Sequence, residues 1–346
     1  MAAVTAKKIA ELLGVSPAAV SIALNGKSGI SESTRREILS AAEKLGYNPG
    51  KLNTVKNLHK RLCFVFYVDK LVSIAENTTF STFVLKGAEA AASALGYSIF
   101  VRYFHAGEPF ADQLGDQLDD IDGIILLGTD ITPNSRNEIL GFIQRIGNKP
   151  LVIIDSYENF GIADCVCNDN YGGGLQVGQY LISRGCRSIG YIRSRQRMEI
   201  FRQREAGLTE ALKSAGLSLD AVIDTEVSFD DAYRCFNDYL NTAKYIPEGF
   251  FAENDNIAAA AIRALNAHGI KVPEQVSLIG FDDIPICELT APALTTIHSF
   301  KEQLGKAAVQ TIAANFSLVQ DGMSSEDKGN ITLSVSTQLH IRDSVK

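Results

Sequence analysis

The sequence predicts an all-α N-terminal head that contains a helix-turn-helix, followed by an α/β core of two doubly wound parallel-sheet subdomains. Three observations predict this organisation. Residues 1–60 carry nine Lys or Arg and four Asp or Glu, whereas the rest of the chain carries 24 basic and 36 acidic residues. The first 46 residues contain three short helical segments, each with a capping residue. After residue 60, apolar runs of strand length alternate with segments of helical periodicity, which is typical of parallel sheets covered by helices on both faces.

The composition excludes several classes of protein. With 346 residues, of which 46% are hydrophobic, the chain can bury a large core and form two or three domains. No apolar run approaches the roughly 18 residues that a membrane helix needs, and the first 15 residues lack the apolar stretch of a signal peptide. We therefore expect a cytoplasmic protein with no membrane partner. The six cysteines and five histidines are dispersed without metal-ligand spacing, so we expect reduced thiols, no metal and no cofactor.

The head is predicted to contain three short helices. Each begins after a hydroxyl side chain that can cap its N-terminus, namely Thr5, Ser16 or Ser31. The apolar positions of these helices are expected to face a common core: Ile9, Leu12, Leu13, Val20, Ala23, Leu24, Ile38, Ala41, Ala42 and Leu45. The tight turn Gly14-Val15-Ser16 between the first two helices indicates a helix-turn-helix, and with the basic charge it predicts DNA binding.

The core is predicted from alternating strands and helices. The expected strands are residues 62–68, 98–104, 123–127, 151–155, 188–192, 222–227, 249–252 and 276–281. The expected helices are residues 82–95, 109–119, 134–146, 171–184, 199–215, 230–240 and 255–268. Two such series imply two subdomains, and folds of this kind bind ligands at the carboxyl ends of the strands and in clefts between subdomains.

Polar residues follow several of the predicted strands: Thr129, Asp155, Asn254, Asp255 and Asp282. Taken singly, Asp255 or Asp283 could simply cap the following helix. Together in one cleft, the carboxylates and the amide could accept hydrogen bonds from hydroxyl groups, while Arg204 could donate a two-pronged one. These residue types favour a polyhydroxylated ligand, a sugar or sugar derivative. Because the chain has no Trp, the candidate stacking platforms are Phe80, Tyr157 and Phe281.

The stretch VTAKKIAELLGVSPAAVSIALNGKSGISESTRREILSAAEKLGYNP resembles the head of the LacI/GalR family of bacterial repressors. The similarity includes Val4-Thr5, Gly14-Val15-Ser16, Leu24-Asn25 and the closing Leu45-Gly46-Tyr47. The runs PLVIIDSY, RQREAGL, FAENDNIAAAAI and SLIGFDDIP extend the resemblance over essentially the whole chain. It implies a periplasmic-binding-protein-like core, an effector in the cleft, and a homodimer on a double-stranded DNA operator.

The resemblance also implies which residues contact the effector: Phe80, Ser81, Asp155, Arg204, Asn254, Asp255 and Asp282. Thr129 and Tyr157 complete the predicted set. By the same resemblance, residues 1–48 form the DNA-binding domain, 49–60 the linker and 61–346 the core. The expected crossings between subdomains lie near 161–164, 290–293 and 320–325. The first subdomain is then 61–161 with 293–322, and the second is 162–292 with 323–346.

In the head, the family's major-groove readers fall at Pro17, Ala18 and Ile22, whose side chains form no hydrogen bonds. We therefore expect apolar contacts with bases, chiefly with thymine methyl groups. The alternative is that Ser16 or Ser21 reads the bases. The polar and basic residues expected to hold the head on DNA are Thr5, Ser16, Ser21, Asn25 and Lys27.

The linker departs from the family's pattern. Where the family has a hinge helix with a small Ala and then a Leu that wedges between base pairs, this chain has Asn53 and Lys56. A lysine ammonium cannot be buried between bases, so we expect Lys56 to grip the edge of the minor groove electrostatically, with little DNA bending. Two alternatives stay open: a register shift that offers Leu52 or Val55 as the wedge, and a disordered tether.

Two other classes of protein are less consistent with the sequence. A secreted solute-binding protein would share the core, but the basic head and the missing signal peptide count against it. An enzyme is not expected, because the chain has no GxSxG motif, P-loop lysine or metal-ligand spacing. The sequence therefore predicts a sequence-specific transcription regulator, acting as a repressor, whose operator affinity a small molecule controls. Whether that molecule induces or co-represses stays open.

Overall fold

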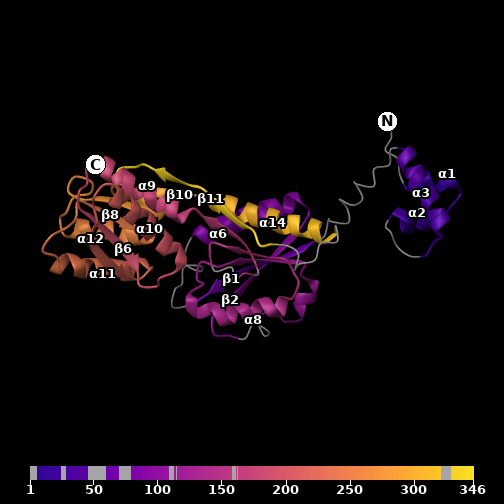
Figure 1. Ribbon diagram of the computed structural model, residues 1–346, viewed down its shortest axis with the longest axis horizontal. Helices are drawn as coiled ribbons and strands as arrows, with labels where there is room; N and C mark the ends of the chain where they lie inside the picture. The colour runs from indigo at the N-terminus through magenta and orange to yellow at the C-terminus, as the bar shows by residue number, and fades with distance from the viewer. Residues whose placement is uncertain are drawn as a thin grey trace. The chain divides into compact units, whose positions relative to one another are not determined.

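The structure is a computed structural model, and it describes residues 6–24, 29–45, 60–69, 79–108, 113, 115–157, 161, 163–320 and 329–346. Contacts within the chain separate an N-terminal unit, which includes Met1–His59, from a core unit, which includes Lys60–Ala94 and Ser98–Lys346 (Figure 1). Each unit has its own hydrophobic core.

The head contains the three predicted helices, α1 (Ala6–Leu13), α2 (Pro17–Leu24) and α3 (Glu32–Lys44). The Ser16 hydroxyl accepts a hydrogen bond from the Ala19 N–H at 3.1 Å, so Ser16 caps α2 as predicted. Gly14 has a φ of 65°, the left-handed conformation that commonly ends a helix. The buried core of the head consists of Ile9, Ala10, Val20, Ala23, Ile38 and Ala42. Leu12 differs from the prediction and is 63% exposed, because the buried stripe of α1 runs through its neighbours at positions 9, 10 and 13.

Six strands form the sheet of the first subdomain, in the order β11-β5-β4-β3-β1-β2. All of their pairings are parallel. The strands are β1 (Arg61–Val68), β2 (Ser98–His105), β3 (Gly123–Leu127), β4 (Leu151–Ile154), β5 (Asp164–Asn168) and β11 (Thr332–Val335). Helices α6 (Thr79–Ala94) and α14 (Lys301–Gln320) lie on one face of this sheet, and α8 (Arg136–Ile146) lies on the other (Figure 1).

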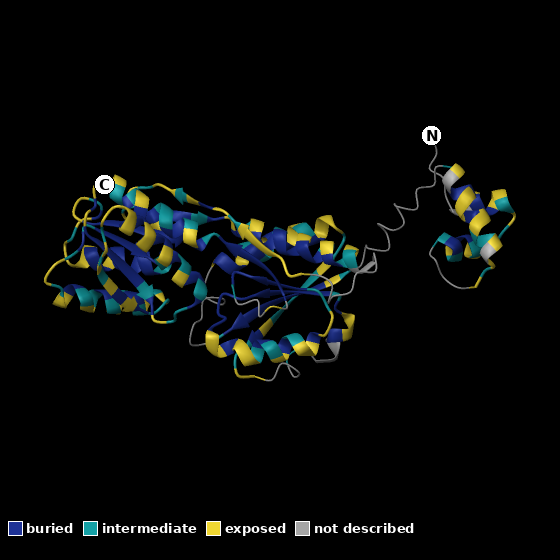
Figure 2. Ribbon diagram, viewed as in Figure 1, coloured by how far each residue is buried: buried dark blue, intermediate teal, exposed yellow. Residues whose placement is uncertain are grey.

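Six further strands form the sheet of the second subdomain, in the order β12-β10-β9-β8-β6-β7. Among the described strands only β12 pairs in the antiparallel sense, with β10. The strands are β6 (Ile189–Ser194), β7 (Leu219–Thr225), β8 (Gly249–Ala252), β9 (Ser277–Asp282), β10 (Thr295–Ser299) and β12 (Thr337–His340). Helices α9 (Asn170–Ser183) and α10 (Glu199–Ser214) pack on one face; α11 (Phe229–Thr242) and α12 (Asp255–Ala267) pack on the other, and α13 (Ile286–Leu289) follows β9. Figure 2 shows the strands buried beneath helices whose outer sides are exposed.

The chain passes between the two subdomains three times, and each crossing lies several residues later than expected. It leaves the first sheet between β5 and α9, returns between β10 and α14, and leaves again between β11 and β12. The expected crossings near 161–164, 290–293 and 320–325 fall before these strands. The reason is that β5, β10 and β11 remain paired with strands of the sheet they are leaving, and this pairing is not visible in a sequence.

Most predicted strands and helices of the core lie within a few residues of their expected positions. The pattern did not predict α14, β10, β11 or β12. Of the expected helix over 109–119, residues 109–112 and 114 lie outside the described residues, Gln113 is helical, and Gly115–Asp120 forms a 3₁₀ helix. None of the described helices combines the length and apolar character needed to cross a bilayer.

Candidate functional site

The carboxyl ends of strands from both sheets meet at one cavity. It is lined by Phe80, Thr129, Asp155, Ile200, Phe201, Arg204, Asn254, Asn256, Asp282 and Ile284. An adjoining cavity shares Thr129, Asp155 and Ile200 with it and adds Tyr157. These two cavities, called the cleft below, bring together seven of the nine predicted effector-binding residues. The other two, Ser81 and Asp255, are buried but do not line the cleft.

Arg204 is the centre of the cleft. It extends from α10, is only 2% exposed, and uses all three of its guanidinium nitrogens. Nε donates to Asn170 Oδ1 at 2.8 Å, one terminal nitrogen donates to the Glu253 carbonyl, and the other donates to Asp282 Oδ1 at 3.2 Å. The guanidinium also lies 3.6 Å from the centre of the Phe281 ring. The side chain is therefore fixed by partners on α9, β8 and β9 before any ligand arrives.

Strained backbone marks two of the strand ends. Among the described residues other than glycine, positive φ occurs only at Asp155 (56°), Asp282 (107°) and Asp283 (55°). A non-glycine residue in this region costs about 1–3 kcal/mol, and such residues concentrate at functional sites. In this chain the strained turns bring two carboxylates, those of Asp155 and Asp282, to face the cleft.

The ionisation of these carboxylates is shifted toward neutrality. Burial raises the pKa of Asp155 to about 6; the nearby Arg204 charge opposes this rise and the Asp282 charge adds to it. Asn168 Nδ2 donates to Asp155 Oδ1 at 3.1 Å. Burial also raises the pKa of Asp282, although Arg204 and Lys301 hold it down. The cleft thus contains two buried carboxyl groups, those of Asp155 and Asp282, close to the single guanidinium of Arg204.

Two polar oxygens beside the cleft have no hydrogen-bond partner among the described residues. They are Thr129 Oγ1, which lines the cleft, and Asn168 Oδ1, whose amide nitrogen holds Asp155. A buried polar atom without a partner costs about 1–3 kcal/mol. Thr129 therefore offers an unused donor and acceptor that a polar ligand could satisfy.

The side chains of Asn254 and Asp255 form hydrogen bonds that stabilise the fold. Asn254 Oδ1 accepts the Ile257 N–H at 2.8 Å and so caps α12, while its side chain also borders the cleft. Asp255 accepts a hydrogen bond from the Thr296 hydroxyl and one from the Ile284 N–H. Asp255 therefore does not cap α12, because Asn254 is the N-cap; the Asp255 carboxylate instead joins the first turn of α12 to β10 and to the residues after β9.

Glycines allow α9 to approach the site closely. A Cβ at Gly174 would lie 2.1 Å from the Arg204 carbonyl oxygen, and one at Gly173 would lie 2.5 Å from the Phe281 ring. Gly173 and Gly174 thus let α9 pack closely against Arg204 and its stacking partner Phe281.

The cleft is narrow. The larger of its two cavities leaves about 20 Å³ of space, which is room for about one water molecule. A sugar-sized ligand can enter only if the two subdomains or their side chains move apart.

The sequence did not predict four residues that line the larger cavity, Ile200, Phe201, Asn256 and Ile284, or two residues that hold Arg204. Asn170 fixes Arg204 Nε, and Glu253 supplies the carbonyl that holds a terminal nitrogen. Glu253 lies in the run GFFAEN, directly before Asn254 at the same strand end. This position after a predicted strand could have identified Glu253 as a residue of the site.

The predicted DNA-reading residues lie at the start of α2 on the head. Ser16, Pro17, Ala18 and Ser21 are exposed and Ile22 is partly exposed. The other predicted DNA contacts, Thr5, Asn25, Lys27, Leu52 and Lys56, lie outside the described residues, as does the linker at 49–59.

The head and the core together define a class of protein. A helix-turn-helix unit is joined to a two-subdomain core with a polar cleft, which is the organisation of a ligand-controlled transcription regulator. Residues 5–50 match the family described as "Bacterial regulatory proteins, lacI family", and residues 179–345 match the "Periplasmic binding protein-like domain". The chain thus combines a LacI-family DNA-binding domain with a periplasmic-binding-protein-like domain, and it is a DNA-binding transcription regulator rather than an enzyme.

Relatives match the chain over nearly its whole length. It is 29% identical over 355 residues to the HTH-type transcriptional repressor PurR of Haemophilus influenzae (strain ATCC 51907 / DSM 11121 / KW20 / Rd), covering 99% of this chain and 98% of that protein. The PurR repressor of Mannheimia succiniciproducens is 28% identical with the same coverage. The solved complex of the transcriptional regulator CelR with cellobiose is 25% identical, with a TM-score of 0.70 over 99% of this chain and 100% of that one. The lac repressor dimer bound to operator and the anti-inducer ONPF, at 21% identity, a TM-score of 0.66 and 99% coverage of both chains, shows the fold alone.

Proposed function

We propose that this chain is a repressor that binds an operator as a homodimer and whose affinity is controlled by a sugar or sugar derivative in the cleft. The observation that carries the proposal is the buried Arg204, held rigid between three partners and facing the Asp155 carboxylate and the unpartnered Thr129 hydroxyl. Because regulators of this kind act on the chromosome, we propose that this one acts in the cytoplasm.

The chemistry of the cleft suits vicinal hydroxyl groups. The carboxylates of Asp155 and Asp282 accept from hydroxyls, and the Arg204 guanidinium donates. Phe80 adds an aromatic surface at the same cavity. The regulator CelR, similar in fold, is solved with cellobiose, which supports a sugar. The relatives named PurR are the reason to include purines among the candidates in a test.

A two-state core gives the mechanism. Phe80, Thr129 and Asp155 belong to the first subdomain, and Arg204, Asn254 and Asp282 belong to the second. A ligand that bridges both groups favours one angle of closure over another, and it shifts the operator affinity only by its difference in affinity for the two states. The residues proposed for DNA contact are the predicted set, with Ser16, Pro17, Ala18, Ser21 and Ile22 on α2.

The experiment that tests the effector class is a thermal-shift screen of the purified protein with sugars, nucleosides and purines. A true effector at 100 times its Kd stabilises the folded state by about 2.7 kcal/mol. We expect one group of related sugars to raise the melting temperature in proportion to the logarithm of concentration. A shift given by purines and by no sugar would refute the sugar assignment while leaving the regulator assignment intact.

We predict that effector binding depends on pH through Asp155. Because burial raises the pKa of Asp155 to about 6, this side chain is largely protonated at pH 5 and largely ionised at pH 7. A neutral sugar that donates a hydroxyl hydrogen bond to the carboxylate prefers the ionised form, so its affinity should rise between pH 5 and pH 7 and then level off. Isothermal titration calorimetry at several pH values measures this rise. In Asp155→Asn the affinity should be lower and should depend less on pH over the same range, with the remaining dependence due to Asp282, whose pKa burial also raises.

We predict that the head recognises thymine methyl groups. Pro17, Ala18 and Ile22 are exposed or partly exposed on α2 and have no hydrogen-bonding side-chain group. Replacing thymine by uracil across an operator half-site removes only methyl groups, and it should weaken binding measured by fluorescence anisotropy. The control is the same substitution outside the half-site. Unchanged affinity with uracil, combined with a loss in Ser16→Ala or Ser21→Ala, would assign the reading to the serines.

A further inference from the structure

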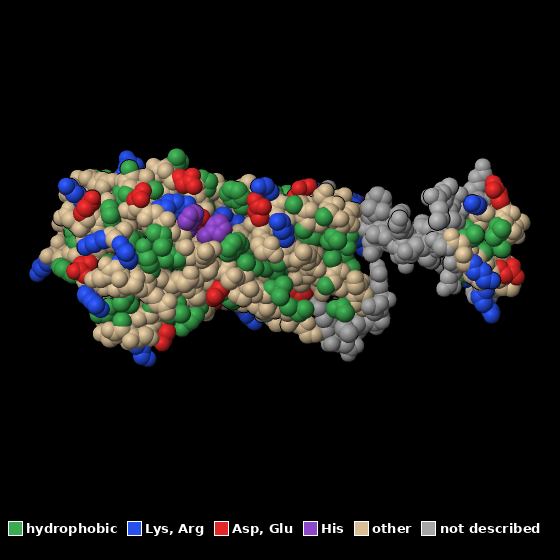
Figure 3. Space-filling view, turned by 90° about the horizontal axis from the view of Figure 1, so that it is seen from above, with side chains coloured by type: hydrophobic (Ala, Val, Ile, Leu, Met, Phe, Trp, Pro, Cys, Tyr) green, Lys and Arg blue, Asp and Glu red, His purple; other side chains and the backbone are tan. Residues whose placement is uncertain are grey.

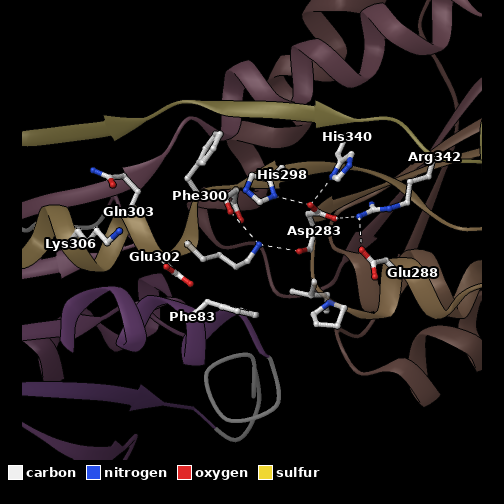
Figure 4. Close-up of a pocket in the computed structure, with 14 residues that line it drawn as sticks. Phe83, Asp283, Glu288, His298, Phe300, Glu302, Gln303, Lys306, His340 and Arg342 are labelled. Carbon is white, nitrogen blue, oxygen red and sulfur yellow. Dashed lines mark hydrogen bonds and ion pairs between the residues drawn. The ribbon is translucent and has the colours of Figure 1, made fainter. Parts of the chain in front are cut away.

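A second group of polar side chains lies at a pocket other than the cleft. Asp283 follows β9, His298 lies on β10, and His340 is the last residue of β12. The Nδ1 atom of His298 is 2.7 Å from Asp283 Oδ2, and the Nδ1 atom of His340 is 2.9 Å from the same oxygen (Figure 4). One potential ligand atom from each residue thus lies within 4.8 Å of the other two.

These three side chains line an open pocket of about 520 Å³, which shares only Ile284 with the cleft. Both histidine side chains are accessible, at 36% and 53% exposure, whereas the Asp283 side chain is 9% exposed. Figure 3 shows histidine side chains grouped at the surface of the core. An ion in solution can therefore reach the two imidazoles without opening the fold.

The geometry fits the ligand set of a transition metal. Two imidazoles and one carboxylate are a common protein donor set for Zn²⁺, Co²⁺, Ni²⁺ and Fe²⁺. With metal–ligand bonds of roughly 2.0–2.2 Å, ligand atoms around a tetrahedral ion stand roughly 3.3 Å apart. The two nitrogen–oxygen distances need to lengthen by well under 1 Å and the two histidine nitrogens, which lie within 4.8 Å of each other, need to come closer; rotations of two partly exposed histidines can supply both changes.

The surroundings orient the carboxylate. Arg342 donates to Asp283 Oδ1 at 2.7 Å, which leaves Oδ2 as the oxygen that faces both histidines. Carboxylates that bind metals are typically held by such outer hydrogen bonds. Lys301 donates to the Asp283 carbonyl at 3.1 Å, and Glu288 lies 3.8 Å from Arg342. The two cations reduce the attraction for a metal, and Glu288 offsets one of them, so the expected affinity is micromolar rather than that of a structural zinc site.

We propose that Asp283, His298 and His340 bind one divalent transition-metal ion of the Zn²⁺, Co²⁺ or Ni²⁺ class, with its remaining positions open to the pocket. The ion replaces the two N–H···O hydrogen bonds with three metal–ligand bonds. It connects β10 and β12, each of which adjoins a crossing between subdomains, to the turn that follows Asp282. Sequence spacing gave no sign of this site, because the three residues meet only through the pairing of β9, β10 and β12.

The test is a titration of the full-length, chelator-treated protein with Co²⁺, whose visible absorption reports coordination by nitrogen and oxygen ligands. We expect one Co²⁺ per chain, displaced by Zn²⁺. His298→Ala and His340→Ala should each weaken binding at least tenfold. His268→Ala is the matched control, because His268 is exposed at the end of α12 and its side chain is hydrogen-bonded only to Asn237 among the described residues. Its affinity for Co²⁺ should equal that of the wild type.

A second readout separates metal binding from a cluster that is only hydrogen-bonded. The Asp283 carboxylate accepts from both histidines, so in the metal-free protein both Nδ1 atoms carry protons. A metal at Nδ1 moves the proton of each neutral imidazole to Nε2. ¹⁵N NMR of the histidine side chains should show this change of tautomer for two histidines on addition of Zn²⁺. The proposal is wrong if Co²⁺ up to about 1 mM gives no absorption change, or if both histidine variants bind Co²⁺ as tightly as the wild type.

Discussion

Replacing Arg204 by Ala should raise the dissociation constant of the effector by about 10- to 150-fold. A hydrogen bond to a charged group contributes about 1.5–3 kcal/mol, and 1.4 kcal/mol corresponds to a factor of ten. Arg204 is the only described cation among the residues lining the cleft, and its guanidinium is already immobilised by Asn170, Glu253 and Asp282. Its loss also leaves the Asp155 carboxylate without its counter-charge and Asp282 with Lys301 alone, so the cleft itself is weakened.

Two measurements distinguish this effect from general damage. Effector affinity is measured by calorimetry, and operator affinity without effector is measured by fluorescence anisotropy; only the first should change. Arg204→Lys keeps the charge but loses the planar fork, and we expect it to recover only part of the affinity. Arg195→Ala is the control, because Arg195 pairs with Glu226 on an exposed surface of the same subdomain. An Arg204→Ala variant that responds to effector like the wild type would show that the effector binds elsewhere.

The architecture could be predicted from sequence because it depends on local patterns. Apolar runs such as LCFVFYV and GIILL are buried along their length in parallel strands, and the hydroxyl of Ser16 caps α2 where the pattern placed it. The places where the chain changes subdomain could not be predicted to the residue. These places depend on which strands pair with each other. For example, β5 and β11 are neighbours in the sheet although they lie far apart in the sequence.

The site was predictable to the level of strand ends. Asp155, Asn254 and Asp282 each follow an apolar run, and the strands that carry them end at the same cleft. What the sequence could not show is how each polar atom is used. Asp255 has the same type of position, yet its carboxylate is taken by Thr296 and Ile284. The histidines that meet at Asp283 are separated along the chain, so only the fold brings them together.

Replacing Glu253 by Ala should lower the free energy of unfolding by about 3–5 kcal/mol, the usual cost of removing one member of a buried charged network. The Glu253 side chain is fully buried at the end of β8. Its carboxylate accepts hydrogen bonds from the Tyr191 hydroxyl at 2.6 Å, the Ser194 N–H at 2.6 Å and Arg197 Nη1 at 2.5 Å. Truncation leaves the buried Ser194 N–H without this acceptor, and it leaves the Tyr191 hydroxyl only a longer hydrogen bond to the Phe201 carbonyl and Arg197 only its pair with Glu205. Urea unfolding monitored by circular dichroism measures the loss.

The size of that loss depends on the donors left behind, and two further variants test this reasoning. Glu253→Gln keeps the volume and one acceptor oxygen but turns an amide donor toward groups that also donate, so we expect a smaller loss of about 1–3 kcal/mol. Glu226→Ala is the same substitution at an exposed position, where Glu226 pairs with Arg195. An exposed ion pair typically contributes about 0–1 kcal/mol to the free energy of unfolding. Because the Glu253 carbonyl also holds Arg204, Glu253→Ala should weaken effector binding along with the fold. A loss in Glu253→Ala no greater than in Glu226→Ala would mean that the network around β8 adds nothing beyond a surface ion pair.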